Sequence, residues 1–80
     1  RKATVFYEKT IRANKKYYPA YPRLAGVYAE TDVLKARRIL KSCLKLNSRY
    51  KPALEALADT YRKTNPDIAR KYDELIIKLK

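Results

Sequence analysis

The chain contains an internal repeat: YYPAYPRLAGVYAETDVLKARRILKSCLKLN (17–47) aligns without a gap on YKPALEALADTYRKTNPDIARKYDELIIKLK (50–80). Eleven of the 31 aligned positions are identical, where chance would give about two or three. The same offset of 33 residues places KATVFYEKTIRAN (2–14) on KARRILKSCLKLN (35–47). We therefore expect a single domain over 1–80, in which 1–16 is the second helix of a partial repeat and 17–49 and 50–80 are repeats.

Each full repeat has two segments whose apolar residues recur at helical spacing. Pro52 suits a first helical turn, where its missing N–H is not needed. Pro66 disfavours helix at Asn65 and can open the next helix, and Asp32 is predicted to cap the matching helix of the preceding repeat. The expected fold is all-α, with five helices in antiparallel hairpins. The apolar stripes of the last repeat are Ala53, Leu54, Ala56, Leu57, Ala58 and Tyr61, then Ile68, Tyr72, Leu75, Ile76 and Leu79.

The composition fits a folded helical chain. Apolar residues make up 46% and charged residues 35%, with one glycine and four prolines, which argues against disorder. No apolar run is long enough for a membrane span or a signal peptide, so we expect no membrane insertion. The chain starts at Arg1 and is expected to be a piece of a longer protein, whose compartment is unknown and is taken as cytoplasmic by default.

The sequence contains no residue pattern that is typical of a catalytic site. It contains no histidine, and its one cysteine, Cys43, has no partner for a disulfide or a zinc site. No glycine-rich loop, carboxylate cluster with metal spacing, or nucleophile beside a base is present. We therefore expect no enzyme activity, no cofactor and no metal, and we expect Cys43 to be a small core residue.

The repeated unit resembles the tetratricopeptide repeat (TPR), whose paired helices carry a bulky residue, Leu, a small residue and Tyr, followed by Ala in the second helix. The matching residues are Tyr21, Leu24, Ala25, Tyr28, Ala36, Leu40 and Cys43, and then Leu54, Leu57, Ala58, Tyr61, Ala69, Asp73 and Ile76. The resemblance implies a right-handed α-solenoid that acts as a protein-interaction scaffold. Half-repeat arrays of RNA-processing factors rank second, because the chain lacks the tryptophans of their signature.

The chain departs from the TPR pattern in three features, its repeat length and two residues. The period is 33 and not 34, Ser48 replaces the usual closing proline, and Asp73 stands where an aromatic residue is expected. Asp73 predicts that the last helix packs differently from the others. An uncapped solenoid also exposes an apolar end, so self-association through residues such as Leu75, Ile77 and Leu79 is a further expectation.

The TPR resemblance implies a concave groove, lined by the first helix of each repeat, that binds a protein or peptide partner. Carried onto this chain, the groove positions are Pro19, Pro22, Arg23, Gly26, Ala29, Glu30, Pro52, Glu55, Ala56, Asp59, Arg62 and Lys63. Their charges are mixed, and the Lys and Asn pattern of the family's carboxylate clamp is missing. Tyr18 has no counterpart in the next repeat and is predicted to be an exposed contact.

The net charge of +12 favours a partner that carries negative charge. On the second helices, cations fall opposite the apolar stripe and predict a basic ridge on the outer, convex side: Lys9, Arg12, Lys35, Arg37, Arg38, Lys41 and Lys45. Such a ridge could attract RNA or an acidic surface. It lacks the aromatic and amide groups that read bases, so a nucleic-acid partner ranks behind a protein partner.

Overall fold

The computed structural model describes residues 2–79, with side chains from Thr4 onwards. This part of the chain is all-helical, as expected, with five helices and no strand. The helices are α1 (Lys2–Ala13), α2 (Ala20–Ala29), α3 (Val33–Leu46), α4 (Lys51–Tyr61) and α5 (Pro66–Lys78).

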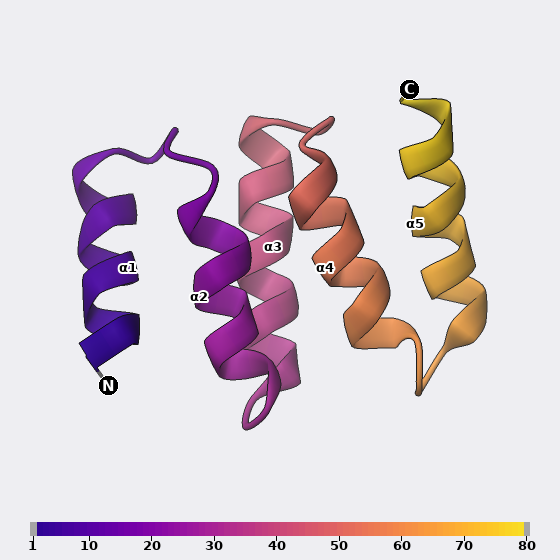
Figure 1. Cartoon of the computed structure of the whole chain (residues 1–80), viewed down its shortest axis with the longest axis horizontal. Helices are drawn as coiled ribbons and strands as arrows, with labels where there is room; N and C mark the ends of the chain where they lie inside the picture. The colour runs from indigo at the N-terminus through magenta and orange to yellow at the C-terminus, as the bar shows by residue number, and fades with distance from the viewer. Residues whose placement is uncertain (1, 80) are drawn as a thin grey trace.

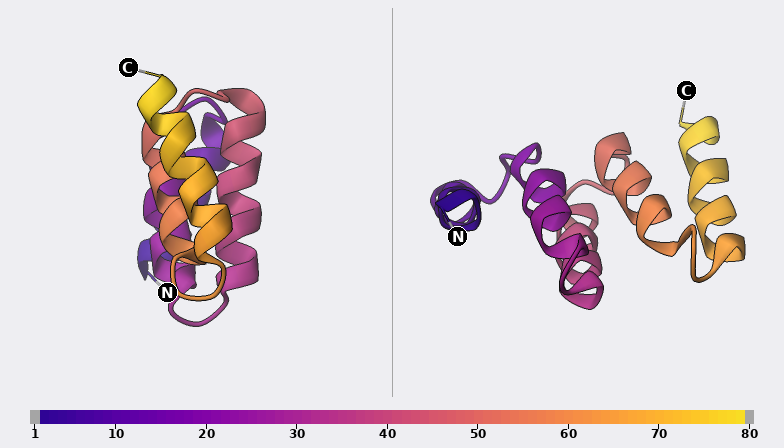
Figure 2. Two further views of the ribbon diagram at one scale, coloured as in Figure 1. Left: turned by 90° about the vertical axis from the view of Figure 1, so that its right-hand side faces the viewer. Right: turned by 60° about the horizontal axis from the view of Figure 1, so that its bottom comes forward.

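The helices stand side by side in chain order, with α1 and α5 at opposite ends of the row (Figure 1). Each helix packs against the next one in the chain, and α2 also packs against α4. The resulting body measures 33 × 27 × 15 Å, and its narrow dimension is seen when the row is viewed end-on (Figure 2). Within residues 2–79, α1 contacts only α2, and α5 contacts only α4.

The 33-residue offset of the sequence recurs in the hydrogen bonds that connect one hairpin to the next. The side-chain oxygens of Asn14 and Asn47 accept hydrogen bonds from the backbone N–H two residues further on, at 3.1 and 3.3 Å. Their backbone oxygens accept from the N–H groups of Tyr17 and Tyr50, at 3.0 and 3.2 Å. Asparagine favours such turns because its side chain imitates a backbone acceptor.

The turns inside the two hairpins also match. The Asp32 side chain accepts a hydrogen bond from the N–H three residues on, and Asn65 does the same one period later. The N-cap predicted at Asp32 is confirmed. Each cap residue also donates its own N–H to the carbonyl oxygen of the tyrosine four residues before it, Tyr28 or Tyr61. These caps satisfy N–H groups that would otherwise lack a partner at the helix start.

The core lies between the helices and is built from small and large residues in alternation. The fully buried side chains of largest volume are Leu40, Leu57 and Cys43, so the placement predicted for Cys43 is confirmed. Alanines fill the positions between them, which lets the helix backbones come close. The buried apolar residues are Ala20, Tyr21, Leu24, Ala25, Ala36, Leu40, Cys43, Ala53, Leu54, Leu57, Ala58 and Ala69.

Helix α5 is held less tightly than α3. Three residues of α3 are buried, whereas Ala69 is the one buried residue of α5 in the described chain. Asp73 and Ile76 of α5 occupy the positions that Leu40 and Cys43 have in α3, and both remain partly accessible. Fewer residues of α5 than of α3 are buried because α5 packs against one helix, α4, whereas α3 packs against both α2 and α4.

Candidate peptide-binding groove

A groove of about 480 Å³ opens between α2 and α4, with α3 beneath it. We call it the α2–α4 groove. Its α2 wall is small and apolar, formed by Pro22, Ala25, Gly26 and Ala29, and its α4 wall contains Ala56. Small side chains on both helices leave space that larger ones would fill, so another polypeptide could approach both backbones here.

Gly26 lines this groove in the middle of α2, at a position where the fold does not require a glycine. Its backbone φ is not positive, and a Cβ built on it would meet nothing within 4 Å. Glycine inside a helix is less favourable than alanine by about 0.5–1 kcal/mol. Glycine at position 26 therefore lowers the stability of the helix and leaves the wall of the groove open.

The polar residues of the groove lie around the C-terminal end of α4, on α4 itself, in the turn after it and on α3. The groove is lined there by Asp59, Thr60, Lys63 and Thr64, together with Arg37 of α3. Asp59 and Lys63 are groove positions that the TPR resemblance implies, as are Pro22, Gly26, Ala29 and Ala56. The groove therefore presents an apolar section followed by a section with one carboxylate, one amine and one guanidinium.

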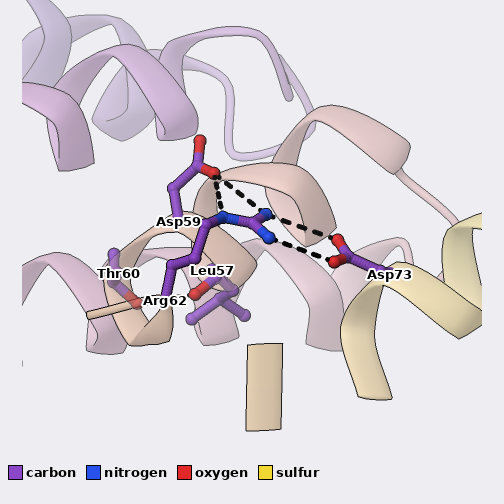
Figure 3. A network of polar contacts seen from close by, with 5 residues as sticks. All are labelled: Leu57, Asp59, Thr60, Arg62 and Asp73. Atoms are coloured by element: carbon purple, nitrogen blue, oxygen red, sulfur yellow. Dashed lines mark hydrogen bonds and ion pairs between the residues drawn. The ribbon is translucent and has the colours of Figure 1, made fainter. Parts of the chain in front are cut away.

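Arg62, a further predicted groove residue, is engaged in an ion-pair network. Figure 3 shows its guanidinium between the carboxylates of Asp59 and Asp73, at 3.2 Å from each. The hydrogen bonds to Asp73 and Asp59 raise the pKa of Arg62 above its already high ordinary value. This arrangement connects α4 to α5 and gives Asp73 a partner in place of an aromatic contact.

The remaining predicted groove residues lie elsewhere. Arg23 and Glu30 line a second hollow, where α2 faces Tyr7 of α1. Glu55 is exposed on α4 and is not part of the wall of the α2–α4 groove. The structure thus places Asp59 and Lys63 in the groove, with Arg62 paired to Asp59 beside it, and it places Arg23, Glu30 and Glu55 elsewhere.

The prediction for Tyr18 does not match its position. Tyr18 is partly buried and packs against the core, with its ring centroid 5.5 Å from that of Tyr50. The neighbouring Tyr17 is 50% exposed. The turn that starts at Asn14 directs the first tyrosine outwards and the second inwards, a choice that two adjacent tyrosines in a sequence do not reveal.

Arg37 also lies differently from the solvent-facing position expected in the basic ridge. Its guanidinium stacks 3.9 Å from the ring centroid of Tyr61. It donates hydrogen bonds to the backbone oxygen of Thr60 at 2.7 Å and to its hydroxyl at 3.2 Å. A cation at the end of α4 is favoured by the helix dipole, and Arg37 fastens α3 to α4.

The other ridge residues divide into two groups. Lys35 is partly buried and lies 4.3 Å from the ring centroid of Tyr28, the residue one period before Tyr61. The other five residues are exposed to solvent: Lys9, Arg12, Arg38, Lys41 and Lys45. These five therefore remain available to an external partner.

Cys43, the one cysteine of the chain, is a free and buried thiol. Burial raises the pKa of the Cys43 thiol to about 11, which keeps it in the neutral, unreactive form. No group of three potential metal ligands among histidine, cysteine and carboxylate side chains occurs in this part of the chain. None of the described helices is long and apolar enough to cross a membrane.

Comparison with known proteins gives no relative: no family model, curated protein or solved structure matches the chain. Function therefore has to follow from the 33-residue register and from the surfaces described above.

Proposed function

We propose that the chain is a TPR-like helical scaffold whose α2–α4 groove binds a peptide segment of a partner protein. The observation that carries this proposal is the open groove beside Gly26, a helix glycine that the fold does not require. Open space next to backbone permits close approach of a second polypeptide. Catalysis plays no part in this proposal.

The packing supports a solenoid-like arrangement. The first helices of the two full repeats, α2 and α4, contact each other, and α3 contacts both of them. Matching turns at Asn14 and Asn47 give the two hairpins the same entry, and those at Asp32 and Asn65 give them the same internal turn. Repetition of one hairpin with constant turns is how helical-repeat proteins build extended binding surfaces.

The groove favours a peptide with small or aliphatic side chains followed by a polar section. Its apolar walls suit the first part, and Lys63 and Asp59 suit the second. Asp59 already pairs with Arg62, whereas Lys63 is exposed and can receive a carboxylate. The family's C-terminal carboxylate clamp is not part of the proposal, since the Lys and Asn pattern is missing.

The test is selection of binders from a displayed random peptide library on the wild-type chain, followed by transfer to two variants. Gly26→Trp fills the groove from a position with free space around its Cβ. Glu74→Trp adds the same side chain at an exposed position of α5 outside the groove. Selected peptides should lose binding to Gly26→Trp and keep it with Glu74→Trp. Equal binding to all three proteins would contradict the proposal.

A further inference from the structure

A further hollow, of about 420 Å³ and distinct from the one lined by Arg23 and Glu30, lies between α1 and α3 on the flank of α2 away from the α2–α4 groove. We call it the α1–α3 hollow. It exists because α1 and α3 both pack on α2 and, within residues 2–79, not on each other. Aliphatic side chains line it: Ile11, Leu24, Ile39 and Leu46.

Two lysines stand at its edge. Lys15 lines the hollow from the connection between α1 and α2, and Lys45 lines it from the last turn of α3; both are exposed. The backbone of Lys15 is anchored, because the Tyr21 hydroxyl donates a hydrogen bond of 2.8 Å to its backbone oxygen. Burial raises the pKa of Tyr21, so this donor keeps its proton. A buried residue therefore anchors the backbone that carries one of the two lysines.

The surroundings of this edge contain no compensating acid in the sequence. No Asp or Glu occurs between Glu8 and Glu30, or between Asp32 and Glu55. Glu8, the one carboxylate of α1, lies two turns before Lys15 and accepts a hydrogen bond from Tyr28. Cations without nearby anions give a positive local potential.

The residues that correspond to this edge one repeat period later, 33 positions further along the chain, carry a different charge. The counterparts of Lys15 and Lys45 are Ser48 and Lys78, and the counterpart of Ser42 is Leu75. The paired lysines are therefore specific to the α1–α3 hollow and are not a by-product of repetition.

We propose that the α1–α3 hollow is a second docking site, which binds an acidic amphipathic segment of a partner protein. Aliphatic side chains of the segment enter the hollow, and its carboxylates pair with Lys15 and Lys45. Such a ligand matches both properties of the site, apolar walls and an acid-free cationic edge. Single-stranded nucleic acid matches only the charge, because it binds by stacking on aromatic rings, and Tyr21, the one aromatic residue of the hollow, is buried.

The experiment uses the 80-residue chain and three labelled probes in fluorescence anisotropy. They are an amphipathic peptide with leucine on one face and glutamate on its flanks, the same peptide with lysine for glutamate, and an oligouridylate. The acidic peptide should bind and the lysine peptide should not. Lys15→Glu/Lys45→Glu should weaken binding about tenfold or more, and Lys15→Gln/Lys45→Gln, which perturbs the helix end less, should weaken it in the same direction.

The matched control is Arg70→Glu/Lys71→Glu, which changes the net charge equally at two exposed positions of α5 and should leave binding unchanged. Ser42→Trp, which occupies the hollow, should also abolish binding, whereas Gly26→Trp should not. Equal losses in both double variants would overturn the proposal, since only total charge would then matter. Tighter binding of oligouridylate that depends on Lys15 and Lys45 would overturn it in favour of nucleic acid.

Discussion

Gly26 and Cys43 are residues whose surroundings differ completely. Gly26 faces open space on α2, and Cys43 is completely buried on α3. One affects stability through the backbone and the other through solvation of its ionised form. Each leads to a measurement that isolates its effect.

Gly26→Ala should stabilise the chain by about 0.5–1 kcal/mol, because alanine lowers the entropy cost of helix formation and its Cβ meets no neighbour. Urea unfolding followed by circular dichroism measures the change. The reverse substitution at Ala56 on α4, Ala56→Gly, should destabilise the chain and serves as the comparison. A loss of stability in Gly26→Ala would show that the glycine has a structural role.

Cys43 should make the stability fall at alkaline pH. The pKa of the Cys43 thiol is about 11 in the folded chain, against an ordinary value of 9.0. Above pH 9 the unfolded chain therefore releases a proton that the folded chain retains. This contribution is complete below pH 9 and is lost as the pH rises towards 11. The free energy of unfolding of Cys43→Ala, measured from pH 8 to pH 11, should therefore fall less steeply than that of the wild type.

Tyrosine titration acts in the same direction in this comparison. Burial, and then the charge of the ionised Cys43 beside them, raises the pKa of Tyr21 and Tyr50, so both proteins lose stability at alkaline pH. Cys43→Ala removes the share of this loss that Cys43 causes, and the difference between the two pH profiles therefore reports both the thiol and its effect on the two tyrosines. Parallel profiles would contradict the prediction.

At the scale of elements, α5 is attached to α4 by a polar contact where α3 uses a buried leucine. Asp73 receives hydrogen bonds from Arg62 at the position that Leu40 has in α3. Both side chains of this ion pair are about half exposed, and exposed pairs contribute little to stability. Leu75 and Ile77 also remain 47% and 64% exposed on α5.

Asp73→Leu should therefore raise the melting temperature. A leucine facing α4 gains apolar burial, and Arg62 keeps its contact with Asp59. Differential scanning calorimetry measures the change, with Asp67→Leu at an exposed position of the same helix as the control. A marked fall in melting temperature would mean that the ion pair, and not apolar packing, holds α5 in place.

The whole molecule is dominated by its charge of +12 on 80 residues. Repulsion between like charges destabilises a compact chain, and salt screens it with a Debye length of about 8 Å at physiological ionic strength. Few intramolecular ion pairs oppose this effect: the described residues contain the two made by Arg62.

The melting temperature should consequently rise when sodium chloride is increased from low to moderate concentration. Arg70→Glu/Lys71→Glu lowers the net charge by four and should show a smaller rise, which separates charge repulsion from general salt effects. A melting temperature that falls with salt would indicate that attractive pairs outweigh repulsion.

The sequence by itself determined the helices and their register. Apolar spacing, Pro52, Pro66 and the cap at Asp32 are local signals, and a 33-residue identity pattern places them in corresponding positions. Local backbone chemistry suffices for such features. For the same reason Cys43 could be assigned to the core, since it follows the apolar stripe of its helix.

Only the tertiary structure decided which side chains meet across helices. Arg37 belongs to a charged, outward-looking pattern in sequence, yet it binds Thr60 and Tyr61 on α4. Tyr18 turns inwards and Tyr17 outwards, and Arg62 joins Asp73 of the next helix. These contacts depend on the crossing of neighbouring helices, which periodicity along one helix does not contain. The α1–α3 hollow depends on the same geometry, because it forms where two helices share a neighbour without touching each other.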